Sequence, residues 1–188
     1  MKIVGIFGSP RPEGNSTTIA KHFLREVEER GAETKTYTLN RLTYKGCQGC
    51  YACKTKLDRC ILQDDLSDVL DEVGKADAVV LSTGTYYGEI TSQLKAFIDR
   101  TFSYLKPDYN TNAQPARIAP GKKLVFIITQ GGPESRFGDI FQRYNQFFKW
   151  YGFTESYLIR AYGTTPKIPS EIPDEYLRQA EETARKII

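Results

Sequence analysis

The chain has 188 residues, 26% of them charged, and a formal net charge of +3. This length is typical of one large domain that buries its own core without disulfide bonds. The basic residues are spread along the chain without a Lys/Arg block, which argues against nucleic-acid binding. No stretch approaches the ~20 apolar residues of a membrane span, so no membrane partner is expected.

The first apolar run, Lys2–Phe7, is too short for a signal peptide and is followed by a loop motif rather than a cleavage site. We therefore expect a cytoplasmic protein. In such a reducing compartment, clustered cysteines bind metal or carry out redox chemistry more often than they form structural disulfides.

Apolar runs and amphipathic stretches alternate from end to end, which predicts a parallel sheet covered on both faces. Strands are expected at Lys2–Phe7, Thr34–Leu39, Ala78–Leu81, Lys123–Thr129 and Glu155–Ala161. Helices are expected at Ser16–Arg30, Asp65–Val73, Thr91–Leu105, Asp139–Tyr151 and Pro173–Ile188. Without a repeat or a domain boundary, residues 1–188 are predicted to form a single doubly wound α/β domain.

Two further segments lie in the second half of the chain. Lys106–Gly121 is a long polar stretch, and connections of this length are either functional lids or surface insertions without a role. The predicted helix at Asp139–Tyr151 carries an aromatic stripe, which we interpret as core and subunit contact. The stripe consists of Phe141, Tyr144, Phe147, Phe148 and Tyr151.

Ligands of open α/β sheets bind beyond the carboxyl ends of the strands, where three loops are expected. The first runs from a strand into the N-terminus of a helix, where free N–H groups and the helix dipole favour an anion. Its candidate phosphate ligands are Ser9, Arg11, Asn15, Ser16 and Thr17. The loop is not a Walker A motif, because Asn15 stands where the phosphate lysine is needed. Its glycines also do not have the G-x-G-x-x-G spacing. The alternative is plain N-capping of the helix by Asn15 or Ser16.

The second and third loops follow the next strands. Ser82–Glu89 contains glycines that let the backbone approach a flat ligand, and Tyr86 and Tyr87 could stack on that ligand. Thr129–Pro133 offers two exposed glycine amides. A phosphate site beside a flat, aromatic-lined slot is what flavin mononucleotide (FMN) requires.

All four cysteines, Cys47, Cys50, Cys53 and Cys60, fall in one short run with the spacing C-x₂-C-x₂-C-x₆-C. Three interpretations are open: a [4Fe–4S] cluster, free thiols or a redox-active pair, and zinc. Zinc more typically takes pairs of ligands from two separate knuckles. The chain has one histidine, His22, to which we assign no role, and no Ser/His/Asp grouping supports hydrolysis.

Four segments together resemble the NADPH-dependent FMN reductase family of flavodoxin-like proteins: GSPRPEGNSTT, CQGCYACKTKLDRCILQDD, TGTYYGEITSQLKAFIDR and TQGG. Within that family, the chain is most similar to the iron–sulfur flavoproteins and their cluster-free relatives. The resemblance implies FMN, a sheet of order 2-1-3-4-5, and a homodimer or homotetramer.

The resemblance also assigns residues to the parts of FMN. The phosphate would be held by Ser9, Arg11, Asn15, Ser16 and Thr17, and the ring by Thr83, Gly84, Thr85, Tyr86, Tyr87 and Gly88. Thr129 and Gly131 of the third loop complete the predicted flavin site. Relatives usually have proline at the position of Gly84, so a looser turn is expected to alter flavin affinity or potential.

The expected function is transfer of electrons from NAD(P)H to a quinone, an azo or nitro compound, or a flavin. Because FMN would carry the chemistry, no side chain is assigned as catalytic. One alternative is an electron carrier in which FMN and a [4Fe–4S] cluster act between protein partners. The other is a non-catalytic metal-binding module with a vestigial flavin site.

Overall fold

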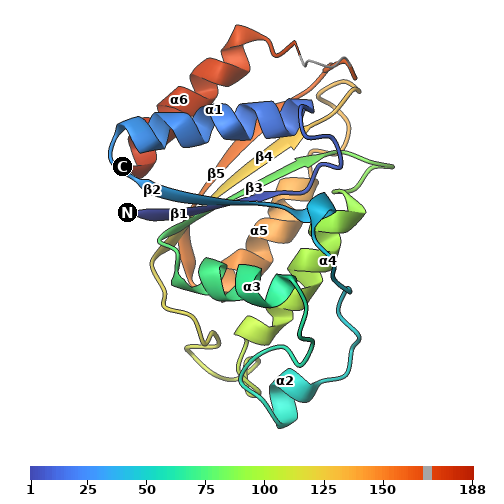
Figure 1. The fold of residues 1–188 in the computed structure, drawn as a ribbon, viewed down its shortest axis with the longest axis vertical. Coiled ribbons are helices and arrows are strands. Elements are labelled where there is room, and N and C mark those ends of the chain that lie inside the picture. The colour runs from blue at the N-terminus through green and yellow to red at the C-terminus, as the bar shows by residue number, and fades with distance from the viewer. Residues whose placement is uncertain (167–170) are drawn as a thin grey trace.

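The structure, a computed structural model, describes residues 1–166 and 171–188 and contains one five-stranded sheet. The strands are β1 (Lys2–Phe7), β2 (Glu33–Thr38), β3 (Ala78–Gly84), β4 (Lys122–Thr129) and β5 (Phe153–Ala161). They pair in parallel in the order β2-β1-β3-β4-β5 (Figure 1). The predicted fold class and strand order are therefore confirmed.

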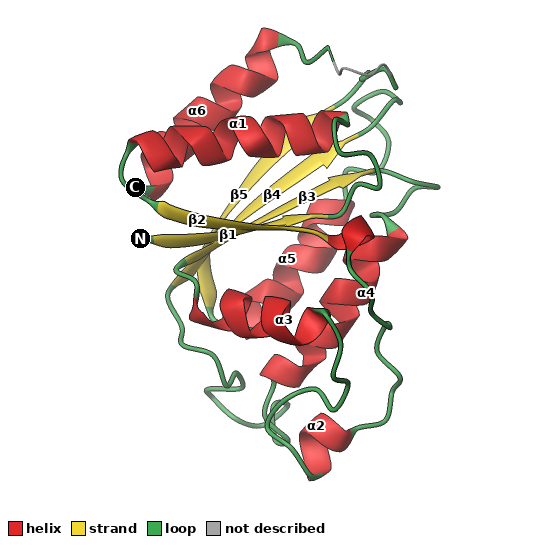
Figure 2. Ribbon diagram, in the orientation of Figure 1, coloured by secondary structure: helices red, strands yellow, loops and turns green. Residues whose placement is uncertain are grey.

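Helices cover both faces of the sheet (Figure 2). One face carries α1 (Asn15–Glu29) and α6 (Asp174–Ile187), and the other carries α3 (Leu66–Lys75), α4 (Ser92–Arg100) and α5 (Ile140–Trp150). Side chains alternate across a strand, so each strand feeds both cores. In β1, Val4 and Ile6 pack with α3, α4 and α5, whereas Ile3 and Phe7 pack with α1 and α6. None of the described helices is both long and apolar enough to cross a membrane.

Two predicted boundaries differ from the structure by three residues or more. The helix expected at Thr91–Leu105 ends at Arg100 and continues as a 3₁₀ turn, η2 (Thr101–Tyr104). The hydroxyl of Thr101 donates to the carbonyl of Ile98 at 2.6 Å, and such back-bonding by Ser and Thr competes with the regular helical pattern. Strand β3 also runs on to Gly84, so the loop that follows it is shorter than expected.

The cysteine run contains a short helix that was not predicted, α2 (Ala52–Thr55), and η1 (Leu39–Arg41) precedes it. The stretch Lys106–Gly121 is fixed against the body of the protein. The amide of Lys106 donates to the carbonyl of Pro115 at 2.8 Å, and the amide of Arg117 donates to that of Tyr104 at 2.7 Å.

The aromatic stripe of α5 divides between core and surface. Tyr144, Phe148 and Tyr151 are buried, so the interpretation as core is confirmed for them. Phe147 and Trp150 remain 44% and 45% exposed. Subunit contact through this helix stays a prediction.

Candidate functional site

The first loop connects β1 to α1 at the edge where the parallel strands end. Helix α1 has Gly14 as its N-cap, no side chain caps it, and its first turn contains no acidic residue. Asn15 and Ser16 lie inside the helix, so the alternative that they act as plain N-caps is wrong. The first-turn amides and the positive end of the helix dipole are left for an anion.

The structure brings the predicted phosphate ligands together in this loop. Ser9, Asn15, Ser16 and Thr17 are all buried, and the Ser9 hydroxyl accepts a hydrogen bond from the Arg11 amide at 3.1 Å. Arg11 Nη1 donates to the carbonyl of Pro166 at 3.1 Å, and Asn15 Nδ2 donates to that of Thr165 at 2.9 Å. The segment after β5 therefore crosses the first loop, which no sequence signal indicated.

Thr91 joins the first and second loops. Its hydroxyl donates to the carbonyl of Gly8 at 2.8 Å and caps α4 by accepting from the amide of Leu94. Its amide donates to the hydroxyl of Thr83 at 3.0 Å. A Cβ at Gly8 would lie 2.7 Å from the Cβ of Leu94, so only glycine permits this approach. Sequence reasoning missed Thr91, although a threonine just before an apolar helix is a recognisable N-cap signal.

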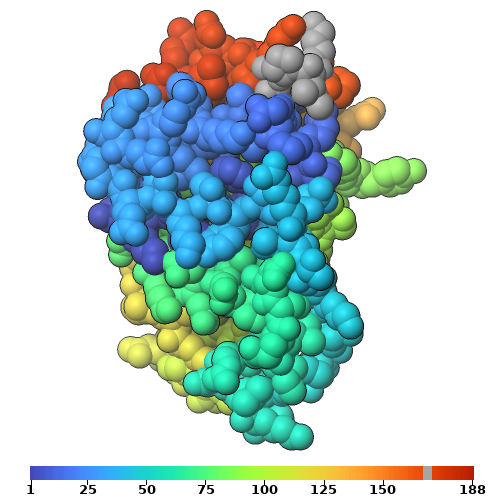
Figure 3. Space-filling view, viewed as in Figure 1, coloured from blue at the N-terminus to red at the C-terminus, as the bar shows by residue number. Residues whose placement is uncertain are grey.

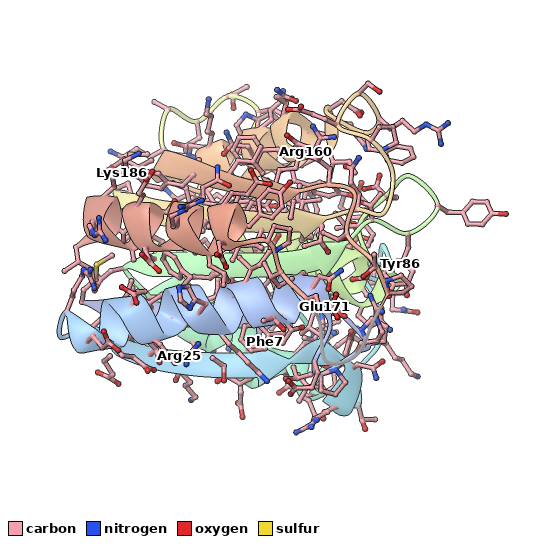
Figure 4. The ribbon with its side chains drawn as sticks, turned by 90° about the horizontal axis from the view of Figure 1, so that it is seen from above. Phe7, Arg25, Tyr86, Arg160, Glu171 and Lys186 are labelled. Carbon is pink, nitrogen blue, oxygen red and sulfur yellow. The ribbon has the colours of Figure 1, made fainter. Side chains whose placement is uncertain are left out.

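The second loop ends in a tight turn over Tyr86–Glu89, closed by two backbone hydrogen bonds of 2.8 and 3.0 Å. Tyr87 and Gly88 have φ values of 53° and 82°, as a type I′ turn requires. The side chain of Tyr87 is fully exposed at the tip, so its ring does not line a slot. The Tyr86 ring lies over Gly84, where a Cβ would come within 3.0 Å of it. Figure 4 shows Tyr86 at this edge of the molecule, away from Lys186.

The third loop is linked to the second because the amide of Thr85 donates to the carbonyl of Thr129 at 2.8 Å. Gln130 is buried, and its side-chain amide donates to the carbonyl of Pro133 at 2.7 Å. Its side-chain oxygen accepts from Arg160 Nη2 at 3.0 Å. A Cβ at Gly131 would lie 3.4 Å from the carbonyl of Thr164. Gln130 and Arg160 thus shape this loop, and sequence reasoning missed both.

The cysteine run leaves the end of β2 and extends along the molecule to α2, on the same side of the sheet as α3 and α4 (Figure 1). In the space-filling view it forms part of the lower surface (Figure 3). Cys47 and Cys50 are exposed, Cys53 and Cys60 are partly buried, and all four are free thiols.

The spacing of the sulfur atoms bears on the choice of metal. No three of the four cysteine sulfurs, all of which the structure describes, lie within 4.8 Å of one another. Four sulfurs bound to one zinc ion at ~2.3 Å lie closer together than this. A four-iron cube spreads its thiolates over four separate metal atoms. The arrangement therefore does not form a preformed zinc site.

Two cationic side chains, those of Lys54 and Arg100, lie next to the cysteine run. Lys54 Nζ lies 3.5 Å from Cys53 Sγ and donates to the carbonyls of Phe102 and Leu105 at 2.7 and 2.8 Å. Burial lowers the pKa of Lys54, and the nearby Cys53 opposes that shift. Burial also acts to lower the pKa of Arg100, but Asp64 and Cys60 raise it above its usual value, so the guanidinium stays charged.

A cavity of about 750 Å³ lies beside the cysteine run. It lies between the cysteine run, α4 and α5, and is bordered by all four cysteines and by Glu89, the last residue of the second loop. Glu89 is held there by Arg143 of α5 at 2.7 Å. The cysteine site and the three loops are thus separate, and Glu89 is the residue of the three loops that borders the cavity.

Comparison with known proteins identifies the family. The model of the NADPH-dependent FMN reductase family matches residues 1–153. The chain belongs to this family. An iron–sulfur flavoprotein of Archaeoglobus fulgidus is 32% identical over 192 residues, covering 100% of this chain and 79% of its own length.

A relative that matches over part of the chain and a more distant solved structure agree with this assignment. An iron–sulfur flavoprotein of Methanocaldococcus jannaschii is 38% identical over 101 residues, covering 54% of this chain and 52% of its own length. A solved NAD(P)H:quinone oxidoreductase from Methanothermobacter marburgensis has a TM-score of 0.75 at 17% identity, covering 100% of this chain and 96% of its own. This last likeness shows the fold alone. Membership of the FMN reductase family makes the chain an NAD(P)H-dependent flavin oxidoreductase.

Unpaired polar atoms at the first and second loops fit FMN, the cofactor of this family. Arg11 Nε, Ser82 Oγ and Thr85 Oγ1 are buried without a hydrogen-bond partner among the described residues. Buried polar groups are rarely left unpaired, and those that are call for an explanation such as a ligand. Arg11 lies in the loop assigned to the phosphate, and Ser82 and Thr85 lie where the ring is expected. The donor set therefore suits a phosphate next to a hydrogen-bonding ring system.

The Asp64–Arg100 pair predicts a pH-dependent contribution to stability. Burial acts to raise the pKa of Asp64, but hydrogen bonds from Arg100, Lys45 and Leu66 hold it below its usual value of 3.8. A lowered carboxyl pKa adds stability above the unfolded-chain pKa, and this stability is lost as pH falls through the folded-state pKa. Asp64→Asn should therefore lower the urea midpoint strongly at pH 7, with a much smaller effect near pH ~3.

The matched control is Asp58→Asn, in the same loop, because the Asp58 side chain is 81% exposed and, among the described residues, pairs only with Arg59. It should leave the midpoint unchanged at both pH values. An equal loss from Asp64→Asn at both pH values would show that the pair contributes no ionic stabilisation.

Proposed function

We propose that the chain is a single-domain iron–sulfur flavoprotein, with FMN at the three loops and a [4Fe–4S] cluster on Cys47, Cys50, Cys53 and Cys60. The observation that carries the proposal is that all four cysteines are free and lie on one loop beside α4. The other end of α4 is capped by Thr91, which is bonded into the flavin loops. The full-length similarity to an iron–sulfur flavoprotein supports it independently.

The residues of the flavin site divide into two groups. Ser9, Arg11, Asn15, Ser16 and Thr17, with the amides at the start of α1, would hold the phosphate. The ring would be held by Thr83, Gly84, Thr85, Tyr86, Tyr87, Gly88, Thr129 and Gly131. Of the two tyrosines, Tyr87 would contribute its backbone alone, because its side chain is fully exposed. FMN, when bound, can take up electrons in pairs and release them singly.

The first experiment is a visible spectrum of anaerobically purified protein, with iron and acid-labile sulfide measured per chain. We expect flavin bands with a broad shoulder, and about four iron atoms per chain. Flavin bands without iron, even after reconstitution with iron and sulfide, would overturn the cluster and leave a two-electron reductase. Protein that stays colourless after addition of FMN would overturn both cofactors.

A second candidate is direct reduction of a quinone, azo or nitro compound or flavin by NAD(P)H at the same site. The exposed turn at Tyr86–Glu89 favours this second function. Because Tyr87 at its tip is fully exposed, the predicted edge of the flavin ring is accessible to small molecules. Steady-state assays separate the two functions. If the iron–sulfur flavoprotein carries electrons between protein partners, it should show no appreciable NAD(P)H oxidation with any small acceptor. A reductase should turn over with at least one.

We also propose that the protein is a cytoplasmic homodimer or homotetramer. Phe147 and Trp150 leave large aromatic surfaces exposed side by side on α5, with ring centroids 6.3 Å apart. Sedimentation of wild-type protein and of Phe147→Ala tests whether this face is the subunit contact. A variant that sediments like the wild-type oligomer would exclude the face.

A further inference from the structure

Arg100 occupies an unusual place for a charged residue. It is the last residue of α4 and is only 1% exposed. Charged side chains are almost never fully buried unless they are paired and hydrogen-bonded. Nothing in the predicted flavin site requires Arg100, and the family resemblance assigned it no role.

Its guanidinium fastens the cysteine run at both ends. Nη1 donates to the carbonyl of Lys45, just before Cys47, at 2.9 Å and to Asp64 Oδ2 at 2.9 Å. Nη2 donates to the carbonyl of Leu62, just after Cys60, at 3.3 Å and to Asp64 Oδ1 at 3.2 Å. The amide of Lys45 also donates to Asp64 at 3.1 Å. The planar Arg100 guanidinium therefore joins the two ends of the loop that carries all four cysteines.

One donor of Arg100 is left over. Nε is buried and has no hydrogen-bond partner among the described residues. Arg100 and Cys60 border the same cavity, and Arg100 Nη2 bonds to the carbonyl of Leu62, two residues after Cys60. Four hydrogen bonds hold the Arg100 guanidinium at the base of the loop, and its Nε–H is left without a partner in the described part of the chain. This group is suited to donate to the sulfur of Cys60, which borders the same cavity.

Lys54 repeats the arrangement at a second cysteine. Its ammonium group lies 3.5 Å from Cys53 Sγ and 4.0 Å from the centre of the Phe102 ring. It is anchored on the carbonyls of Phe102 and Leu105, in and just after η2. Arg117 adds a bond from Nη2 to the carbonyl of Cys53 at 3.0 Å. Arg100 thus ends α4, and Lys54 of α2 bonds to the segment that continues α4.

We propose that Arg100, with Lys54 in support, is a positioning residue that donates to the sulfur of Cys60 and sets the reduction potential of the cluster. The inference rests on the proposed cluster. Hydrogen bonds and positive charge near the sulfurs favour the reduced, more negative cluster and so raise its potential. Groups of this kind also hold ligands in place, and their loss typically costs roughly 10–100-fold in metal affinity.

The test uses the reconstituted holoprotein and three variants. Because a single change at Arg100 would leave the partly buried Asp64 without its partner, Arg100→Gln is combined with Asp64→Asn. Lys54→Gln removes the second, more accessible cation. Lys95→Gln is the matched control, because Lys95 also lies on α4 and borders the same cavity but pairs with Asp99 at 2.5 Å.

The cluster potential is read by electron paramagnetic resonance during redox titration, and iron retention by transfer to a chelator. We expect the double variant and Lys54→Gln to shift the midpoint to more negative potential and to lose iron roughly tenfold faster. Lys95→Gln should match wild type, and all variants should keep one FMN per chain.

Three outcomes overturn the inference, each in its own way. A cluster potential unchanged in both test variants rules out tuning by these cations. A shift in Lys54→Gln equal to that of Lys95→Gln would mean that only overall charge acts there, because both variants lose one positive charge. Wild-type protein that takes up FMN but never iron would overturn the proposed cluster and the inference with it, while leaving the flavin site intact.

Discussion

Replacement of Cys53 or Cys60 by serine is expected to reduce the iron content from about four atoms per chain to near zero, while FMN stays at one per chain. A serine hydroxyl remains protonated at neutral pH and does not replace a thiolate ligand. Because the cysteine run lies apart from the three loops, along α4, the flavin site should not sense the change. Iron, sulfide and flavin assays on the same samples measure the effect.

Gln48→Ala provides the control for this experiment. Gln48 lies between Cys47 and Cys50, and its side chain donates to the carbonyl of Gly46 at 2.8 Å. It should retain full iron. Serine variants that keep their iron would show that Cys53 and Cys60 are not ligands. Loss of iron and FMN together would mean that the two sites fold as one unit.

The sequence predicted the fold well because the strands are short, apolar and separated by clear helical patterns. β1 and β4 lie within one residue of their expected bounds, and the strand order agrees. Boundaries failed where side chains bond to nearby backbone, as Thr101 does at the end of α4. Helical periodicity alone cannot reveal such local competition.

The composition of the candidate site was also predictable, but its supports were not. Local motifs indicated the buried first loop and the clustered cysteines, because each lies on one continuous segment. The bonds from Arg11 to Pro166, from Thr91 to Gly8 and from Arg100 to Lys45 join positions 155, 83 and 55 residues apart. Contacts of this range depend on how the elements pack, and a single sequence gives no direct sign of them.

Arg11→Gln is expected to weaken FMN binding without weakening riboflavin binding. If Arg11 pairs with the phosphate, the lost charge-assisted hydrogen bond is worth about 1.5–3 kcal/mol, or roughly 10–100-fold in affinity. Riboflavin has no phosphate, so wild type and Arg11→Gln should bind it with the same affinity. Quenching of flavin fluorescence during titration of apoprotein measures all four dissociation constants.

Lys21→Gln is the matched control, since Lys21 is a cation beside the same loop but is engaged with Glu13 at 3.1 Å and with the carbonyl of Pro12. It should leave both affinities unchanged. In this structure Arg11 also bonds to the carbonyl of Pro166, so its loss could instead loosen the segment after β5. That alternative would weaken FMN and riboflavin equally, because both flavins meet the same loop. The ratio of the two affinities, rather than either alone, therefore decides whether Arg11 acts on the phosphate or on the fold of the loop.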